Sequence, residues 1–230
     1  ATRLYPLTEN FPKPLLDVNG KAILDWLLDD IDSSRLINEY AVVSNHRYIG
    51  HFKPWAERLR LNAPVKLLDD GSFTNETRLG AVKDIEFAID AIGTGDDIMI
   101  IAGDNLLDFS LSGFMQYFFK KEATCIMRYF EPDPVACSKT GVLTLTEDER
   151  VTAMREKPKN PKPDWCTPPF YIYHRDDLPL IKKAIEENCN TEAPGNLLAW
   201  MVGKTRVYAM EMPGKRYDIG SLESYTKVRE

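Results

Sequence analysis

Short apolar runs rich in valine and isoleucine alternate with segments of helical period in the first half of the chain. The runs at 39–45, 64–68 and 97–105 have the length and composition of buried strands. Between Leu79 and Ile92, apolar residues recur at helical spacing. An alternation of this kind is typical of a parallel sheet covered by helices on both faces. We therefore expect an α/β fold over this part.

The rhythm changes after residue 122. Strand-like segments now follow one another with only turns or loops between them, at 123–130, 141–146, 151–158 and 170–175. Helical patterns return at 177–189, 196–203 and 222–228, with one further strand-like run at 206–212. The whole pattern predicts a Rossmann-like mixed sheet, mainly parallel, flanked by helices and carrying a small antiparallel extension. No linker or repeat divides the chain, so we expect one domain over 1–230.

Composition limits what such a fold can do. The chain has 230 residues, 43% of them hydrophobic, and no apolar run approaches the roughly 18 residues of a membrane span. A formal charge of −6 argues against general adhesion to nucleic acid, but it permits a local cationic pocket for a phosphorylated small molecule. We expect neither a membrane nor a nucleic-acid partner.

The cysteines and histidines give no sign of a disulfide framework or a zinc site. Four cysteines are scattered without a C-x-x-C pair, and three histidines lack metal-ligand spacing. We interpret the cysteines as reduced, which predicts a cytoplasmic protein.

Familiar phosphate-binding and hydrolase motifs fail on inspection. The triplet at 203–205 resembles the end of a P-loop, but Leu198 stands where the motif needs glycine. The segment 93–98 has two glycines, yet it precedes a strand and lacks the third glycine of a dinucleotide-binding turn. No G-x-S-x-G or H-E-x-x-H occurs.

Charged residues at the ends of predicted strands are the remaining candidates, because ligands bind at such ends in open α/β sheets. Asp104 closes a buried run, Asp218 precedes a glycine turn, and Glu156 and Lys157 end another strand. Taken singly, each has an ordinary structural explanation as a turn, cap or surface residue. Arg3 and Lys13 flank an irregular, proline-rich segment at the beginning of the chain, where prolines stiffen the backbone.

The combination and its order are more specific than any member. "RLYPLTENFPKPLLDVNGKAIL", "AGDN", "EKP" and "YDIGSLESY" follow one another along almost the whole chain. In this order they resemble the sugar-1-phosphate nucleotidyltransferases, or NDP-sugar pyrophosphorylases. The resemblance implies an enzyme that joins a nucleoside triphosphate to a sugar 1-phosphate and releases pyrophosphate.

The same resemblance assigns roles on the nucleotide side, which we place in residues 1–122. It implies that Arg3 binds the β and γ phosphates and that Lys13 lies near the α-phosphate. Asp104 and Asp218 would meet at one site and bind a magnesium ion, which prefers hard oxygen ligands. Gly80 would approach the nucleobase. Arg3, Lys13, Asp104, Lys157 and Asp218 would be the catalytic set, acting by positioning and charge stabilisation.

The acceptor side is expected in residues 123–230. By resemblance, Glu156 would accept hydrogen bonds from sugar hydroxyls, Lys157 would hold the sugar phosphate, and the backbone of Gly141 would lie against the sugar. We also expect Lys13 and Lys157 to be solvent-facing. Because side chains alternate along a strand, Tyr171 and Tyr173 share one face of the strand that follows the two prolines at 168–169. We expect this face to point towards the ligand.

Departures from the family pattern leave alternatives open. Family members begin with a strand and a glycine-containing turn before the position of Ala1, so the resemblance implies that this first strand is missing from the sequence. The prolines at 168–169 would also allow a non-sugar phosphomonoester such as phosphocholine, as in a cytidylyltransferase. A non-catalytic regulatory protein that binds nucleotide sugars is the third hypothesis. The nucleobase, the acceptor and the oligomeric state stay open.

Overall fold

The computed structural model describes residues 2–74 and 76–229. Its contacts divide the chain into two compact units. The first unit comprises Ala1–Arg78, Ala102–Ser112 and Pro213–Glu230, and the second comprises Leu79–Ile101 and Gly113–Met212. The predicted division after residue 122 differs from this one, because the last eighteen residues pack with the beginning of the chain. The strand expected before Ala1 lies outside the described residues.

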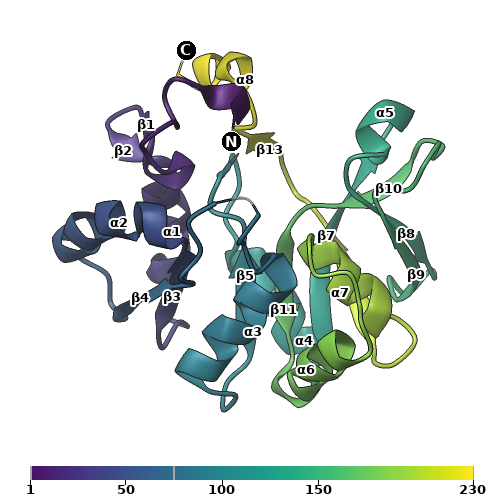
Figure 1. The fold of residues 1–230 in the computed structure, drawn as a ribbon. Coiled ribbons are helices and arrows are strands. Elements are labelled where there is room, and N and C mark those ends of the chain that lie inside the picture. The colour runs from purple at the N-terminus through teal and green to yellow at the C-terminus, as the bar shows by residue number, and fades with distance from the viewer. Residues whose placement is uncertain (1, 75, 230) are drawn as a thin grey trace. The chain divides into compact units, whose positions relative to one another are not determined.

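The first unit combines three two-stranded ribbons with helices. Its elements are η1 (Thr2–Leu4), η2 (Lys13–Leu15), β1 (Asp17–Val18), β2 (Lys21–Ala22), α1 (Ile23–Ser33), β3 (Tyr40–Ser44), α2 (His46–Arg58), β4 (Val65–Asp69), β6 (Asn105–Leu107), β13 (Arg216–Asp218) and α8 (Leu222–Lys227). Strands β3 and β4 pair in parallel, whereas β1–β2 and β6–β13 are antiparallel. Figure 1 shows β13 and α8, drawn in yellow, close to the purple N-terminal segment.

Side-chain hydrogen bonds stabilise the beginning of α2 and the end of α1. Asn45 caps α2, its side chain accepting a hydrogen bond from the backbone N–H of Tyr48 at 3.1 Å. Asp32 is buried near the end of α1, where it accepts bonds from the Asn62 backbone and side chain and from the Tyr40 hydroxyl. These contacts satisfy a buried carboxylate that would otherwise be costly.

Residues from both ends of the chain share one core in this unit. Leu4, Ile23, Ile219 and Tyr225 are buried in a single apolar cluster. Because the cluster joins segments more than two hundred positions apart, the C-terminal segment contributes to the stability of the N-terminal one.

The second unit is built on one seven-stranded sheet. Its elements are α3 (Ala81–Ile92), β5 (Ile98–Ile101), α4 (Ser112–Lys121), β7 (Thr124–Glu131), α5 (Pro134–Cys137), β8 (Gly141–Leu145), β9 (Val151–Glu156), β10 (Asp164–Thr167), β11 (Phe170–Tyr173), η3 (Arg175–Asp177), α6 (Pro179–Glu186), α7 (Pro194–Met201) and β12 (Val207–Glu211). The strand order is β5-β11-β7-β10-β8-β9, with β12 also pairing with β7.

The fold class is confirmed as mixed α/β, with helices beside a central sheet. The expected predominance of parallel pairing is wrong for the seven-stranded sheet, in which β7–β12 is the one parallel pair among the described strands. Strand β11 pairs antiparallel with both β5 and β7, because it runs back between them. Antiparallel neighbours also continue through the predicted β extension.

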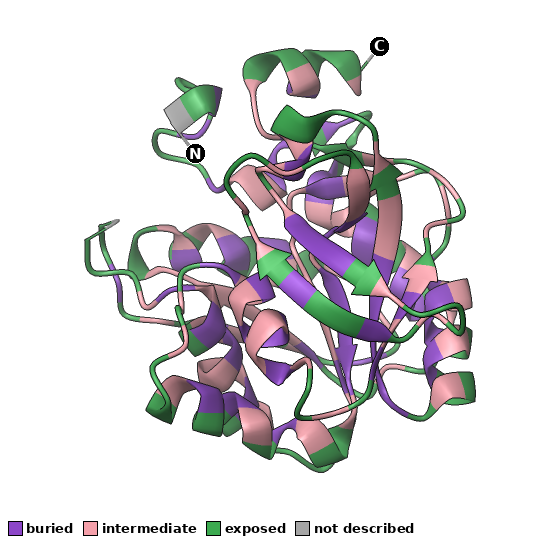
Figure 2. Cartoon of the chain, turned by 90° about the vertical axis from the view of Figure 1, so that its right-hand side faces the viewer, coloured by how far each residue is buried: buried purple, intermediate pink, exposed green. Residues whose placement is uncertain are grey.

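Apolar side chains fill the space between this sheet and its helices. Helices α3, α6 and α7 contact one another, and Figure 1 shows them grouped beside β11. Their inner faces and the sheet form one large cluster that includes Val82, Ile126, Ile181 and Leu197. Figure 2 shows the resulting pattern, with buried residues along the strands and exposed ones on the outer turns of the helices. Among the described residues, no helix is both long and apolar enough to cross a bilayer.

Candidate functional site

One lysine joins the two aspartates that the sequence singles out. The Lys13 ammonium nitrogen lies 2.7 Å from Oδ2 of Asp104 and 3.8 Å from Oδ1 of Asp218. These residues come from three distant segments, and no local turn connects them. The first unit therefore brings together Lys13 and both aspartates predicted to bind the metal.

The register of one ribbon explains how the aspartates meet. Asp218 pairs with Asn105 across the antiparallel β6–β13 ribbon, so it stands beside the residue that follows Asp104. The backbone N–H of Ile219 donates to the Asp104 carbonyl at 3.1 Å. Main-chain hydrogen bonds thus hold both carboxylates at the same end of the ribbon.

Asn105 fixes the orientation of the Asp104 carboxylate. Its side-chain amide donates to Oδ1 of Asp104 at 2.8 Å and to the Ala102 carbonyl at 3.0 Å. Its own oxygen accepts from the Arg216 guanidinium at 2.7 Å. Only 1% of Asn105 is exposed, so its polar atoms are satisfied within the protein. The sequence reasoning missed Asn105 and Arg216, although the asparagine directly follows Asp104 in the "AGDN" motif.

Arg3 lies at the same place. A side chain added at Gly220 would come 3.4 Å from the Asp218 carboxylate and 3.7 Å from the Arg3 guanidinium. Both charged groups therefore lie next to the glycine turn that follows β13. Arg3, Lys13, Asp104 and Asp218 form what we call the charged cluster.

Lys13 is held by the backbone around it. It opens the short helix η2, and the N–H of Leu16 donates to the Lys13 carbonyl at 3.1 Å. Gly103 packs against this segment, since a Cβ there would lie 3.6 Å from Pro14. Only 14% of the Lys13 side chain is exposed, so the expectation that it faces solvent is wrong. Its ion pairs with the aspartates draw it inwards.

The donor set of the charged cluster fits magnesium. Two carboxylates offer hard oxygen atoms, and their side chains are 35% and 53% exposed, which leaves them accessible to an ion. Across residues 2–74 and 76–229, no group of three or more histidine, cysteine or acidic residues could hold a metal ion. A site with two carboxylates is typical of magnesium, which takes its other ligands from water and substrate phosphates.

A second constellation lies in the other unit, around Glu156. A Cβ at Gly141 would come 3.1 Å from its Oε2 atom, and one at Gly195 would come 2.0 Å from it. A side chain at either glycine would therefore displace the Glu156 carboxylate from this position. Gly195 is the second residue of α7 and was missed by the sequence reasoning, although the proline before it is a visible signal of a helix start.

Burial shapes the electrostatics of Glu156. It raises the pKa of the carboxyl above its usual value, an effect that the neighbouring Lys157 ammonium partly offsets. Lys157 is exposed as expected, and it has a positive φ of 46° at the end of β9. A half-buried carboxylate beside two bare glycines is suited to accepting hydrogen bonds from ligand hydroxyls.

The backbone conformation and close packing at position 80 explain why it is glycine. It has a φ of 92°, and a Cβ there would lie 2.7 Å from the Thr191 carbonyl oxygen. That carbonyl accepts a hydrogen bond from the N–H of Val82 at 3.0 Å. Close packing at the start of α3 therefore requires glycine, and an approach to the nucleobase stays a prediction.

The structure contradicts the expected orientation of Tyr171. Tyr171 and Tyr173 are 3% and 0% exposed and belong to the large apolar cluster, with ring centroids 6.3 Å apart. Phe170 and Ile172, on the opposite face of the strand, are buried too. Strand β11 is internal and covered on both faces, so alternation along it does not distinguish a ligand face from a core face.

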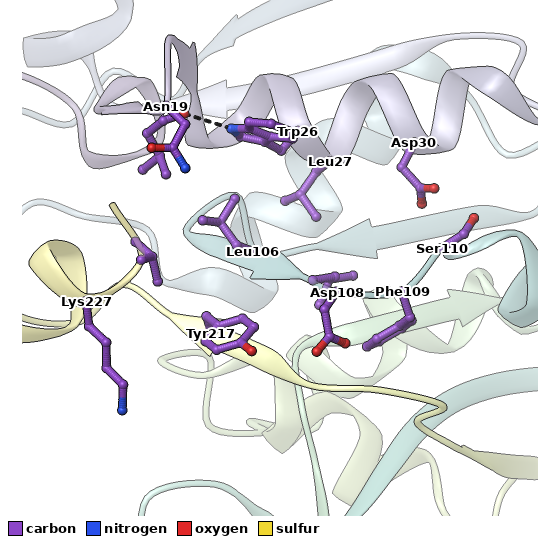
Figure 3. A pocket seen from close by; sticks show the side chains of 13 residues that line it. Asn19, Trp26, Leu27, Asp30, Leu106, Asp108, Phe109, Ser110, Tyr217 and Lys227 are labelled. Atoms are coloured by element: carbon purple, nitrogen blue, oxygen red, sulfur yellow. Dashed lines mark hydrogen bonds between the residues drawn. The ribbon is translucent and has the colours of Figure 1, made fainter. Parts of the chain in front are cut away.

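A separate cavity of about 650 Å³ lies in the first unit (Figure 3). Trp26 and Leu27 of α1 lie across it from Leu106 and Tyr217 of the β6–β13 ribbon. Trp26 is fixed by a hydrogen bond from its indole nitrogen to the Val18 carbonyl at 3.1 Å. No residue of the charged cluster lines this cavity.

Comparison with known proteins places the chain in a family. A family model described as nucleotidyl transferase matches residues 1–230. The chain belongs to the nucleotidyl transferase family. The chain is 24% identical over 238 residues to a glucose-1-phosphate adenylyltransferase of Fervidobacterium nodosum, covering 98% of the chain and 57% of the relative. It is 26% identical over 222 residues to the bifunctional protein GlmU of Methanocaldococcus jannaschii, covering 95% of the chain and 48% of the relative.

Solved structures agree on the fold. A UDP-glucose pyrophosphorylase complexed with UDP-glucose superposes with a TM-score of 0.81 at 19% identity, covering 99% of this chain and 92% of that chain. The chain spans about half to two thirds of the length of the curated relatives that it matches. The resemblance to sugar-1-phosphate nucleotidyltransferases is thus confirmed at the level of family and fold.

Proposed function

We propose that the protein is a sugar-1-phosphate nucleotidyltransferase that forms a nucleotide sugar and pyrophosphate. The observation that carries the proposal is the contact of Lys13 with both Asp104 and Asp218. A cation between two accessible carboxylates, with Arg3 nearby, is suited to a metal-bound polyphosphate. The name of the relative from Fervidobacterium nodosum, which refers to glucose 1-phosphate, supports the same substrate class.

The reaction needs positioning and charge stabilisation but no nucleophile from the protein. An oxygen of the sugar phosphate forms a bond to the α-phosphorus, and the bond to the bridging oxygen of the β-phosphate breaks, releasing pyrophosphate. Arg3 and Lys13 would hold the triphosphate and stabilise the negative charge that spreads onto the leaving group. Magnesium bound by Asp104 and Asp218 would supply further charge neutralisation.

The second unit would supply the acceptor contacts. Glu156 would accept hydrogen bonds from sugar hydroxyls, and the exposed Lys157 would pair with the sugar phosphate. The missing side chains at Gly141 and Gly195 leave backbone next to the Glu156 carboxylate. The retained glutamate favours a polyhydroxyl acceptor over phosphocholine. Tyr171 is not part of this proposal, because it lies in the core.

The test is a pyrophosphate-release screen with magnesium. Each nucleoside triphosphate is combined with a panel of sugar 1-phosphates and with phosphocholine. We expect release with at least one sugar 1-phosphate, and loss of it in both Asp104→Asn and Asp218→Asn. Release with phosphocholine alone would show that the acceptor class is wrong. Binding of a nucleotide sugar without any turnover would favour the regulatory hypothesis.

A further inference from the structure

The segment that links Arg3 to Lys13 is attached to one face of α2. We call residues 5–11 the connecting loop. The loop is largely exposed, including Tyr5, Leu7 and Phe11 at 42%, 39% and 36%. Two turn hydrogen bonds, from Leu7 to the Leu4 carbonyl and from Glu9 to the Pro6 carbonyl, fold it locally, and contacts with α2 hold it from outside.

Arg47 makes the shortest of these contacts. Its Nη2 atom donates to the Glu9 carbonyl at 2.7 Å and to Oδ1 of Asn10 at 3.2 Å. One guanidinium nitrogen therefore fixes the backbone and a side chain of the loop at the same time. Hydrogen bonds from a charged donor are stronger than neutral ones, so this contact is worth more than an ordinary turn bond.

Tyr48 and His51 extend the attachment. The Tyr48 hydroxyl lies 3.3 Å from the Thr8 carbonyl and 3.3 Å from the Glu9 carbonyl. The Phe11 ring meets the His51 ring edge-on, with centroids 5.2 Å apart. The contacts thus follow the loop from its middle to its end, just before Lys13.

Helix α2 is a firm support for these contacts. Its inner face buries Ile49, Phe52 and Trp55 at 8%, 3% and 1% exposure, and the Trp55 indole donates to Asp25 at 2.6 Å. Since the inner face is locked in the core, residues on the outer face have a defined position. The contacts from this helix can therefore restrain the position of the connecting loop.

We propose that Arg47 and Tyr48 are positioning residues that set the spacing and orientation of Arg3 and Lys13 for binding the triphosphate. The proposal rests on the proposed function, since it takes the two cations to be phosphate ligands. Neither Arg47 nor Tyr48 needs to touch the substrate for this role. Their effect passes through the Glu9 and Thr8 carbonyls to the cations on either side.

Arg47→Ala is the principal test, with Arg60→Ala as a matched control. Arg60 also donates to main-chain carbonyls, of Glu57 at 3.1 Å and Leu59 at 2.8 Å, but only within its own turn. We expect Arg47→Ala to weaken binding of magnesium pyrophosphate and raise KM for the triphosphate by about tenfold. Misplaced cations would bind the triphosphate less tightly in the ground state and in the transition state alike. KM for the sugar 1-phosphate and the melting temperature should change little. Arg60→Ala should match the unmodified protein.

Tyr48→Phe separates positioning from direct charge contact. It removes loop hydrogen bonds and leaves every charge in place, so it should shift pyrophosphate affinity in the same direction as Arg47→Ala, by a smaller factor. Arg47→Lys should restore part of the affinity, because an ammonium can still donate to the Glu9 carbonyl. Hydrogen exchange of amides 5–11 should be faster in Arg47→Ala and unchanged in Arg60→Ala.

The outcomes are distinguishable. Unchanged loop exchange together with unchanged pyrophosphate affinity in Arg47→Ala would overturn the positioning role. A second outcome would also overturn it: pyrophosphate affinity falls in Arg47→Ala, but Tyr48→Phe has no effect on it and hydrogen exchange of the loop is unchanged. That result would indicate direct contact of Arg47 with phosphate. If the unmodified protein neither binds nor releases pyrophosphate, the proposed function fails and the positioning role fails with it.

Discussion

At the scale of single residues, the charged cluster depends on the balance between cations and carboxylates. Lys13 is mostly buried because it pairs with Asp104 and Asp218, whereas Lys157 stays exposed. An ammonium in contact with two carboxylates reduces their mutual repulsion. Under the proposed function, the same ammonium would meet an incoming phosphate.

Lys13→Ala tests this role. We expect turnover to fall by at least about 10²-fold, because a fixed charge opposite the reacting phosphate is lost. Lys21→Ala is the control, since Lys21 forms an exposed ion pair with Asp29 at 2.6 Å in the same unit. Steady-state pyrophosphate release compares the two variants. Equal activity in both would contradict the assignment of Lys13 to the site.

Glu156 predicts a dependence of stability on pH. Its raised pKa means that the folded state holds the proton more tightly than the unfolded state. Protonated Glu156 therefore makes its full contribution to the free energy of unfolding below the ordinary carboxyl pKa. That contribution is lost as the pH rises through the raised pKa of the folded state. Glu156→Gln removes the buried charge, so this variant should melt higher than the unmodified protein at about pH 7.5, with the difference vanishing near about pH 4. A difference that stays the same at both pH values would show that ionisation of Glu156 is not its cause.

At the scale of elements, the β6–β13 ribbon decides whether the site exists. The ribbon pairs only three residues from each strand, yet it places Asp218 beside Asp104. A register slip of one residue would turn Asp218 to the other face. The Arg216 guanidinium donates to Asn105 at 2.7 Å across this register, and the Lys215 backbone N–H donates to Asp108 at 2.6 Å just beyond it.

Asn105→Ala should therefore damage both stability and activity. It removes the amide that holds Asp104 and leaves the Arg216 donor unpaired, at a cost of about 1–3 kcal/mol in the free energy of unfolding. We expect weaker magnesium dependence of turnover as well. Asn62→Ala is the control, because Asn62 donates to the buried Asp32 at 2.7 Å in the same unit without approaching the charged cluster. Asn62→Ala should lose stability but keep the magnesium response, and equal magnesium curves for both variants would contradict the role of Asn105.

At the scale of the whole molecule, each compact unit is built from segments that are far apart in the sequence. Residues 213–230 pack with the first unit, where Ile219 is fully buried and Tyr225 is 8% exposed. The Tyr225 hydroxyl also donates to the Asp17 carbonyl. The two ends of the chain should therefore depend on each other for stability.

Ile219→Ala tests this dependence. Removing a fully buried isoleucine side chain costs about 2–5 kcal/mol, and we expect the loss in the first unit. Hydrogen exchange should accelerate in residues 2–33 and 105–107 more than in strands β7 and β11. Deletion of 213–230 should have the same regional effect, only larger. Acceleration confined to the second unit would contradict the division that the contacts show.

The interpretation from sequence was most accurate where a pattern is local. Strands β3, β4 and β7 and helix α3 lie where period and composition predicted them, because burial of one face imposes that period. It was wrong for Tyr171, because alternation shows only that two faces exist and not what covers each. The short strands β6 and β13 carry no period and were not predicted as a pair.

The sequence alone determined the α/β class, the family and the identity of the charged residues, because motif order and apolar period are properties of the chain itself. The cytoplasmic location and the metal stay predictions. Tertiary structure alone decided that Lys13 would contact Asp104 and Asp218, that Gly195 would lie against Glu156, and that Arg47 would hold the connecting loop. Each of these contacts joins residues far apart in sequence, and no local preference specifies such a pairing before the cores form around it.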